Sequence, residues 1–281
     1  MSTVNMPAEM RIVQGPSALG SDPRRFIALT RTLTLTDFKL KFYGSALGYL
    51  WQLVRPLMLF GILLFVFTNF IKFGKVPHYE VLLLLGIVLY SFVAEGVSSA
   101  VDSVVAREPL VRKVQFPRLV IPTAVVATAF LNLLLNLVAV FIFSVVRGVH
   151  PQWQWFELPV ILLLMVMLTS GAAMLVSCLF VRYRDVKPIT EVLLQALFYG
   201  TPIFYPVERI DATLRHLLVM FNPFAAIIQA AKHAFVPQSM TAAEAAGGTV
   251  NLLVPLAIIV GLFALGFYVF NKEAPRIAEE L

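Results

Sequence analysis

The sequence predicts an all-α integral membrane protein with six transmembrane helices, an N-terminal amphipathic interface helix and a re-entrant hairpin before the last span. Of its 281 residues, 59% are hydrophobic and 14% are charged, whereas soluble domains carry about 25% charged residues. Apolar runs such as 81–90 and 158–168 contain almost no side chain that favours water. Basic residues sit in short clusters between these runs, which is typical of topology signals and argues against nucleic-acid binding.

The N-terminal part of the chain divides at Asp22. Residues 1–21 are rich in Pro, Gly, Ser and Met without a period, so we predict a flexible tail. Asp22 and Pro23 then form an N-cap and N1 pair, and apolar residues recur at helical spacing among arginines. This pattern predicts an amphipathic helix over 22–44 that lies on the membrane surface among anionic headgroups, or else a solvated helix packed on a partner.

Six apolar runs follow within 45–281, the predicted transmembrane domain. Each is roughly 20 residues long, the length that a hydrocarbon layer about 30 Å thick requires at about 1.5 Å per residue. A further apolar stretch, cut by Asn222-Pro223 and ended by Pro237, predicts a re-entrant region over 208–237. We place the six spans at 50–71, 81–104, 119–146, 158–181, 187–207 and 250–271.

The distribution of Lys and Arg predicts the orientation. Of the 22 basic residues, 16 fall on the side that holds both termini, and the rest fall on the side of loops 72–80, 147–157 and 208–249. By the positive-inside rule, the richer side faces the cytoplasm. We therefore expect both termini to be cytoplasmic.

The sequence holds no nucleotide-binding or hydrolytic motif. Gly74-Lys75 is followed by Val76, so the phosphate-binding loop of ATPases is missing. The patterns H-E-x-x-H, D-x-D and G-x-S-x-G are absent as well, and the four histidines are scattered over predicted outer loops. We expect no enzyme activity, no metal and no cofactor on this chain, and transport driven by another subunit or by a gradient.

Two inner loops are candidates for contact with a driving subunit. Segment 107–118 combines four cations with apolar residues at near-helical spacing, which predicts a short helix that docks in a groove of a cytoplasmic protein. The alternative is that these charges only set the topology. In the second loop, 182–188, Asp185 is able to pair with Arg182 or Arg184. The predicted coupling residues are Glu108, Leu110, Arg112, Lys113, Phe116, Arg118, Arg184 and Asp185.

Aromatic and charged residues inside the spans are candidates for a substrate pathway. Aromatic rings can stack on sugars, although an aromatic in a membrane helix more often packs or faces lipid. Glu95 lies near the middle of the second span, where a charge costs about 2.5 to 3.5 kcal/mol or more. It should face the interior, a partner or water, or bond to Ser91, Ser98 or Ser99. Arg55 suits a phosphate or pyrophosphate headgroup, of a substrate or of a phospholipid. The predicted pathway residues are Arg55, Tyr90, Glu95, Phe198, Tyr199, Phe204 and Tyr205.

Five segments resemble the ABC-2 type permeases of polysaccharide exporters, of the O-antigen and teichoic acid type. They read LKFYGSALGYLWQLVRPL, LVRKVQFPRLVIP, VRYRDVKP, PIFYP and FNPF, and the resemblance runs from about Asp37 to the last span. It implies a permease of the bacterial cytoplasmic membrane in which two copies form a channel for a lipid-linked glycan, above two copies of a separate ATPase that holds ATP and Mg. Family members often carry an acid and an arginine after Asn-Pro, at positions that here are Gln229 and Lys232.

Other function classes stay open at this point. A drug or small-lipid ABC-2 exporter would share the same topology. A membrane enzyme acting on polyprenyl-linked sugars would also need basic inner loops and aromatic walls, but the sequence lacks a carboxylate cluster for it. A passive membrane anchor for a cytoplasmic complex would tolerate substitution of Glu95 and of the aromatic residues near the fifth span.

Overall fold

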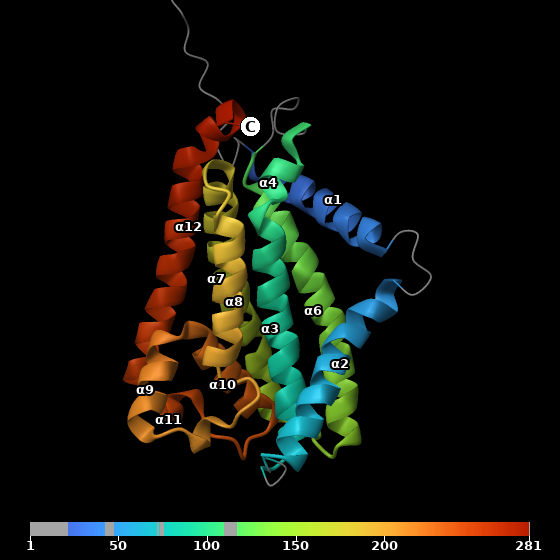
Figure 1. Cartoon of the computed structure of the whole chain (residues 1–281), viewed down its shortest axis with the longest axis vertical. Coiled ribbons are helices and arrows are strands. Elements are labelled where there is room, and N and C mark those ends of the chain that lie inside the picture. Colours follow the sequence, from blue (N-terminus) through green and yellow to red (C-terminus); the bar gives the residue numbers. More distant parts are fainter. Residues whose placement is uncertain (1–21, 43–47, 72, 74–75, 110–116, 281) are drawn as a thin grey trace, which may run out of the picture.

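The long apolar runs fold into a bundle of helices aligned with the longest axis of the molecule (Figure 1). Every regular element in the described ranges is a helix. Five helical stretches are long and apolar enough to cross a membrane, or six if a bent pair counts as one span, which confirms an all-α integral membrane protein. The predicted flexible tail lies outside the described residues. The computed structural model describes residues 22–42, 48–71, 73, 76–109 and 117–280.

Five of the six predicted spans correspond to long helices. For the first four of these, the predicted and observed ends agree within three residues. The last helix continues past the predicted end because Lys, Glu and Ala, which are good helix formers, follow the apolar run. These helices are α2 Gly48–Asn69, α3 Tyr79–Val101, α6 Val120–Val146, α7 Leu158–Arg182 and α12 Leu253–Glu280. Short elements connect them: α4 Ser103–Ala106, η2 Trp153–Glu157, η3 Val207–Arg209, α11 Ala242–Ala245 and η4 Val250–Leu252.

Helix α3 forms the centre of the bundle. In its most apolar window 72% of the residues are buried, against 11% for α2 and 17% for α12. It packs against α2, α6 and α7, and Leu83, Leu85 and Ile87 are completely buried in these contacts. A charged residue on α3 therefore needs partners from the surrounding helices, whereas much of α2 and α12 faces outward.

The fifth predicted span is shorter than expected. Its helix, α8 Val186–Gly200, has 15 residues, which is about 22 Å at about 1.5 Å per residue and less than a hydrocarbon layer of about 30 Å. The helix stops because Thr201 precedes Pro202, and a residue before proline is pushed into the extended region. Thr201 has φ −113° and ψ 143°. The helix therefore ends seven residues before the predicted boundary at 207.

Side chains from other helices satisfy the backbone carbonyls after α8. The Asn222 side-chain N–H donates to Gly200 O at 3.4 Å and to the Thr201 hydroxyl at 2.9 Å. The Lys232 ammonium donates to the carbonyls of Pro202 and, at 3.3 Å, Ile203, and the Tyr79 hydroxyl donates to Phe204 O at 2.6 Å. Non-helical backbone at membrane depth is tolerated only with such partners.

The predicted re-entrant region contains a sharply bent helix pair. Helices α9 Ala212–Phe221 and α10 Pro223–Phe235 meet at an angle of 106°, and both lie at the end of the bundle opposite α4 (Figure 1). Asn222 caps α10 by accepting hydrogen bonds from Phe224 N at 3.1 Å and Ala225 N at 3.2 Å. Most of α10 is buried, whereas only Val219 is buried in α9. This geometry fits a re-entrant hairpin or a broken span.

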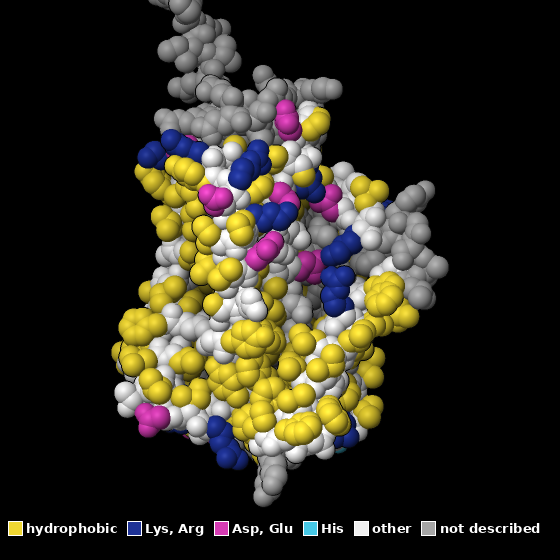
Figure 2. All heavy atoms as spheres, in the orientation of Figure 1, with side chains coloured by type: hydrophobic (Ala, Val, Ile, Leu, Met, Phe, Trp, Pro, Cys, Tyr) yellow, Lys and Arg dark blue, Asp and Glu magenta, His cyan; other side chains and the backbone are white. Residues whose placement is uncertain are grey.

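Helix α1 Pro23–Phe42 covers most of the predicted interface segment. Asp22 begins it by accepting a hydrogen bond from Arg24 N at 2.9 Å. The helix crosses α6 at the buried Thr34, whose hydroxyl donates to Ala124 O at 3.4 Å and whose carbonyl accepts from Thr128 at 3.5 Å. It lies near α4 (Figure 1). Charged side chains gather at the end of the bundle that carries α1 and α4, and the rest of the surface in this view is mostly apolar (Figure 2).

Glycines bring α7 and α12 into close contact. A Cβ atom at Gly171 would lie 2.8 Å from the backbone of Leu262, and one at Gly266 would collide with the Gly171 carbonyl. Small residues allow membrane helices to approach closely, and van der Waals packing then holds them together. This contact fixes α12 to the bundle although most of its surface is exposed.

We expect Gly266→Ala to destabilise the protein by about 1 to 3 kcal/mol, the range of overpacked cores. The matched change on the same helix is Gly261→Ala, where a Cβ meets nothing within 4 Å, and it should leave stability unchanged or slightly raised. Thermal unfolding of the purified protein in detergent measures both. Equal unfolding midpoints for the two variants would show that the helix contact is not tight.

Candidate functional site

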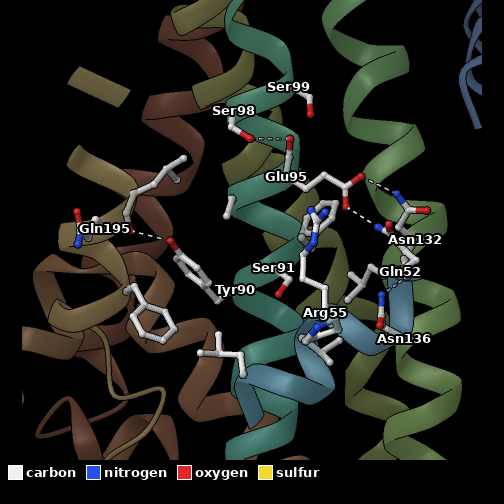
Figure 3. A pocket seen from close by; sticks show the side chains of 18 of the residues that line it. Gln52, Arg55, Tyr90, Ser91, Glu95, Ser98, Ser99, Asn132, Asn136 and Gln195 are labelled. Carbon is white, nitrogen blue, oxygen red and sulfur yellow. Dashed lines mark hydrogen bonds between the residues drawn. The ribbon is translucent and has the colours of Figure 1, made fainter. Parts of the chain in front are cut away.

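A polar cavity of about 770 Å³ opens within the membrane bundle. Its walls come from α2, α3, α6 and α8, with Lys41 from the end of α1 at its margin. Carboxylate, amide and hydroxyl side chains of four helices surround this hollow (Figure 3). The cavity is unusual for its surroundings because α2, α3 and α6 are otherwise strongly apolar.

The carboxylate of Glu95 connects four helices in the wall of the cavity. It accepts hydrogen bonds from Gln52 of α2 at 3.1 Å and from Asn132 of α6 at 2.6 Å (Figure 3). A further hydrogen bond comes from Lys41 of α1. The serines considered from the sequence do not hold it: Ser98 donates to the backbone carbonyl of Glu95 at 3.4 Å, and Ser91 donates to Ile87 O. Glu95 is thus paired with a cation and two amides.

Two asparagines one turn apart extend this polar wall along α6. Asn136 donates to Asn132 O at 2.9 Å. Because a carboxylate only accepts hydrogen bonds, Asn132 must turn its NH₂ group toward Glu95. Its side-chain oxygen is buried and has no hydrogen-bond donor among the described residues. The pair Asn132 and Asn136 was missed from the sequence, although two amides at i, i+4 in a 27-residue apolar helix are a usable signal.

An aromatic cluster forms another wall of the cavity. The rings of Tyr90 and Phe198 lie 4.8 Å apart, and those of Phe198 and Tyr199 lie 5.3 Å apart. The Tyr90 hydroxyl donates to Leu194 O at 2.9 Å, which ties α3 to α8. Phe204 continues the cluster at 5.6 Å from Phe198. Flat apolar faces beside amides and a carboxylate are suited to holding sugar rings by stacking and hydrogen bonds.

The structure brings five of the seven predicted pathway residues to one cavity. Arg55, Tyr90, Glu95, Phe198 and Tyr199 line it. The other two do not line it. Phe204 contacts the ring of Phe198 in the aromatic cluster, and Tyr205 lines a separate small pocket with Lys232. The lining residues that sequence reasoning missed include Lys41, Gln52, Asn132, Asn136, Glu191 and Gln195.

The cavity presents charged and polar side chains that could bind a ligand. Arg55 and Glu191 are exposed at its surface and form no salt bridge with a described residue. Among the described residues, no group of three His, Cys, Asp or Glu side chains is arranged to hold a metal. The arrangement therefore suits recognition of a polar ligand with hydroxyl or charged groups.

Those predicted coupling residues that the structure describes lie at the end of the bundle near α1. Arg107 pairs with Asp37 of α1, and Lys187 pairs with Asp102 at 2.9 Å. Arg118 is buried and Glu108 is partly buried. The remaining coupling residues of the first loop, Leu110, Arg112, Lys113 and Phe116, lie outside the described residues.

The second coupling loop does not form the expected local ion pair. The guanidinium groups of Arg184 and Arg182 lie over the rings of Phe180 and Tyr183, at 4.9 and 5.5 Å, instead of pairing with Asp185. Stacking on an aromatic face is a common alternative partner for arginine. Arg184 and Asp185 stay next to the start of α8, which also lines the cavity.

Comparison with known proteins agrees with this architecture. Residues 28–236 match the family described as ABC-2 type transporter. The chain belongs to this family. Among the relatives of this ABC-2 protein is the "O-antigen export system permease protein RfbA" of Myxococcus xanthus, 25% identical over 92% of this chain and 96% of the relative.

Two further relatives of this ABC-2 protein also match over most of their length. The protein of the same name from Klebsiella pneumoniae is 28% identical over 89% of this chain and 93% of its own length. The "Polysialic acid transport protein KpsM" of Escherichia coli is 23% identical over 86% of this chain and 93% of its own length. The resemblance seen in the sequence is therefore confirmed. The chain is of the type that forms the membrane subunit in this transporter family.

We expect Glu95→Gln to destabilise this ABC-2 protein by about 1 to 2 kcal/mol. The change keeps the shape but removes the charge that Lys41 neutralises, and the value is modest because the Lys41 side chain is 38% exposed. The control is Glu191→Gln, an exposed carboxylate in the same cavity, which should unfold like the wild type. Thermal unfolding in detergent measures both, and equal loss in the two variants would contradict a special role of Glu95.

Proposed function

We propose that this chain is the permease of an ATP-driven exporter that moves a lipid-linked polysaccharide out of a bacterium. The observation that carries the proposal is the cavity inside an ABC-2 bundle, where an aromatic wall faces amides and a carboxylate. The relatives are named for export of O-antigen and transport of polysialic acid, both of which are cell-surface polysaccharides. An aromatic wall suits a polymer that slides, because it binds without a fixed hydrogen-bond register.

Energy for transport has to come from a separate subunit in this proposal. The sequence contains no phosphate-binding loop, so ATP and Mg belong to a partner ATPase, and we expect no cofactor on this chain. We place ATPase docking at segment 107–118, with Arg184 and Asp185 beside it. Two copies of the chain with two ATPases would form the transporter, since α2 and α8 leave the cavity open along one side of a single copy.

The ion pairs of α1 give the proposed docking segment a route to the cavity. Arg107, the first residue of the segment, pairs with Asp37, and one turn later Lys41 pairs with Glu95. Residues four apart lie on the same face of a helix. A displacement of segment 107–118 would therefore tilt α1 and change the hydrogen bonds of Glu95 in the cavity wall.

The proposed location is the bacterial inner membrane, with both termini in the cytoplasm. The end that carries α1, α4 and the C-terminal end of α12 is also the end where charged side chains gather (Figures 1 and 2). The excess of Lys and Arg on this side supports a cytoplasmic position for it. The hairpin of α9 and α10 then lies on the outer side.

We expect charge reversal in the docking segment to abolish assembly. Arg112→Glu combined with Lys113→Glu should reduce the amount of copurifying ATPase by about tenfold or more, because reversed charges at an interface cost at least about 1.4 kcal/mol. Arg209→Glu, an exposed charge at the opposite end, is the control and should copurify normally. If the double variant binds the ATPase as well as the wild type does, docking is elsewhere; if no ATPase copurifies with the wild type, the exporter proposal fails.

We expect Tyr199→Ala to reduce export of the polysaccharide about two- to twelvefold, which corresponds to a lost stacking contact of about 0.5 to 1.5 kcal/mol. Tyr199 is 60% exposed in the cavity wall, and Tyr268 of α12 is 64% exposed away from it. Tyr268→Ala is therefore a matched control that should export normally. Surface glycan in cells with equal amounts of each variant is the measurement, and equal export by both would remove the aromatic wall from the pathway.

A further inference from the structure

A second, apolar groove lies between α1 and α6, outside the polar cavity. It has a volume of about 330 Å³. Phe26, Ile27 and Leu35 of α1 form one side, and Ala127 and Leu131 of α6 form the other. None of these residues lines the cavity that contains Glu95. The groove therefore has no part in the proposed pathway.

The atoms that line the groove are apolar, and Arg31 borders it with the apolar stem of its side chain. Ile27, Arg31 and Leu35 are spaced four residues apart, so they share one stripe of α1. Ile27 is 66% exposed, Leu35 is 41% exposed, and Arg31 between them is exposed and lines the groove. Arg31 forms no salt bridge within the part of the chain that the structure describes. A cation between two exposed hydrophobic residues matches an amphiphile with an anionic head.

The position of the groove along α6 corresponds to the boundary between headgroups and acyl chains. Ala127 and Leu131 lie seven and eleven residues from Val120, the first residue of α6, which is about 10 and 16 Å along the helix axis. The start of α6 belongs to the charged end of the bundle. Interfacial helices bury their apolar faces about 5 to 10 Å into the boundary between headgroups and acyl chains, so the groove extends from this boundary into the region of the acyl chains.

Charge complementarity favours an anionic lipid over other occupants. Besides Arg31, α1 contains Arg24, Arg25, Lys39 and Lys41, whereas Asp37 is its only acid. Asp37 and Lys41 are already used in ion pairs. Basic residues draw anionic headgroups to this part of the surface, and of those on α1 only Arg31 borders the groove.

We propose that the groove binds one anionic glycerophospholipid. Its phosphate lies at Arg31, and one acyl chain lies between α1 and α6 against Ala127 and Leu131. The bound lipid fills the space beside the Thr34 crossing and braces α1 against α6. Because α1 carries Asp37 and Lys41, the lipid stabilises the helix whose ion pairs reach Arg107 and Glu95. The site does not depend on which substrate the protein transports.

The test uses the full purified chain and native mass spectrometry. Phosphatidylglycerol and phosphatidylcholine are titrated separately after detergent washing. The wild type should retain one phosphatidylglycerol with about fivefold preference over phosphatidylcholine, as expected for about 1 kcal/mol from one cation. Arg31→Gln should lose the preference, whereas Lys39→Gln, which removes an equal charge from α1 outside the groove, should keep it.

A second pair of variants separates the groove from general surface lipid. Ala127→Phe fills the groove and should lose the retained lipid, whereas Ile142→Phe enlarges an exposed residue of α6 outside the groove and should keep it. Unfolding midpoints of all four variants check that they are folded. Equal lipid retention by the two Phe variants, or equal effects of Arg31→Gln and Lys39→Gln, would overturn the site. Binding of inorganic phosphate that matches the affinity of the lipid would also overturn it, since no acyl chain would then be involved.

Discussion

The neutralisation of Glu95 is the constraint on which the arrangement of four helices depends. A carboxylate near the middle of the most buried helix needs hydrogen-bond donors, because its charge is costly in an apolar bundle. Its donors come from α1, α2 and α6, namely Lys41, Gln52 and Asn132. These three contacts fix the end of α1 and the upper part of α2 relative to α3. The polar cavity exists because this cluster lies between helices that do not close over it.

The broken backbone after α8 imposes a second requirement at the other end of the same wall. The carbonyls of residues 200–204 have lost helical partners, and Tyr79, Asn222 and Lys232 supply donors from α3 and from the α9–α10 hairpin. The hairpin therefore has to pack against the end of α8. This packing also positions Phe198 and Phe204, whose rings lie 5.6 Å apart. The aromatic wall and the hairpin thus depend on the same hydrogen bonds.

Helix positions that depend on the length of an apolar run were predicted from the sequence. Features that depend on contacts between distant residues were missed. The runs behind α2, α3, α6 and α7 are set by bilayer thickness, so their ends were predicted within three residues. The end of α8 was missed because the apolar residues after Pro202 continue the run, although the proline itself signals a helix end. Glu95 was recognised as unusual, but its partners are 37 to 54 residues away in the chain, and no local pattern indicates them.

The two ways in which outer helices attach to the bundle have different mechanical consequences. Helix α12 is attached to α7 by close glycine packing over a long contact, so separating the two would open a gap along many atoms. Helix α2 is buried over only 11% of its apolar window, and Gln52 provides one of its few polar links to α3. Interhelical hydrogen bonds in membranes contribute about 0.6 kcal/mol on average, with a maximum of about 1.7 kcal/mol. Breaking such a link costs little compared with opening a packed interface, so α2 separates from the bundle at a lower free energy than α12 does, and Glu95 would lose its bond to Gln52 in that motion.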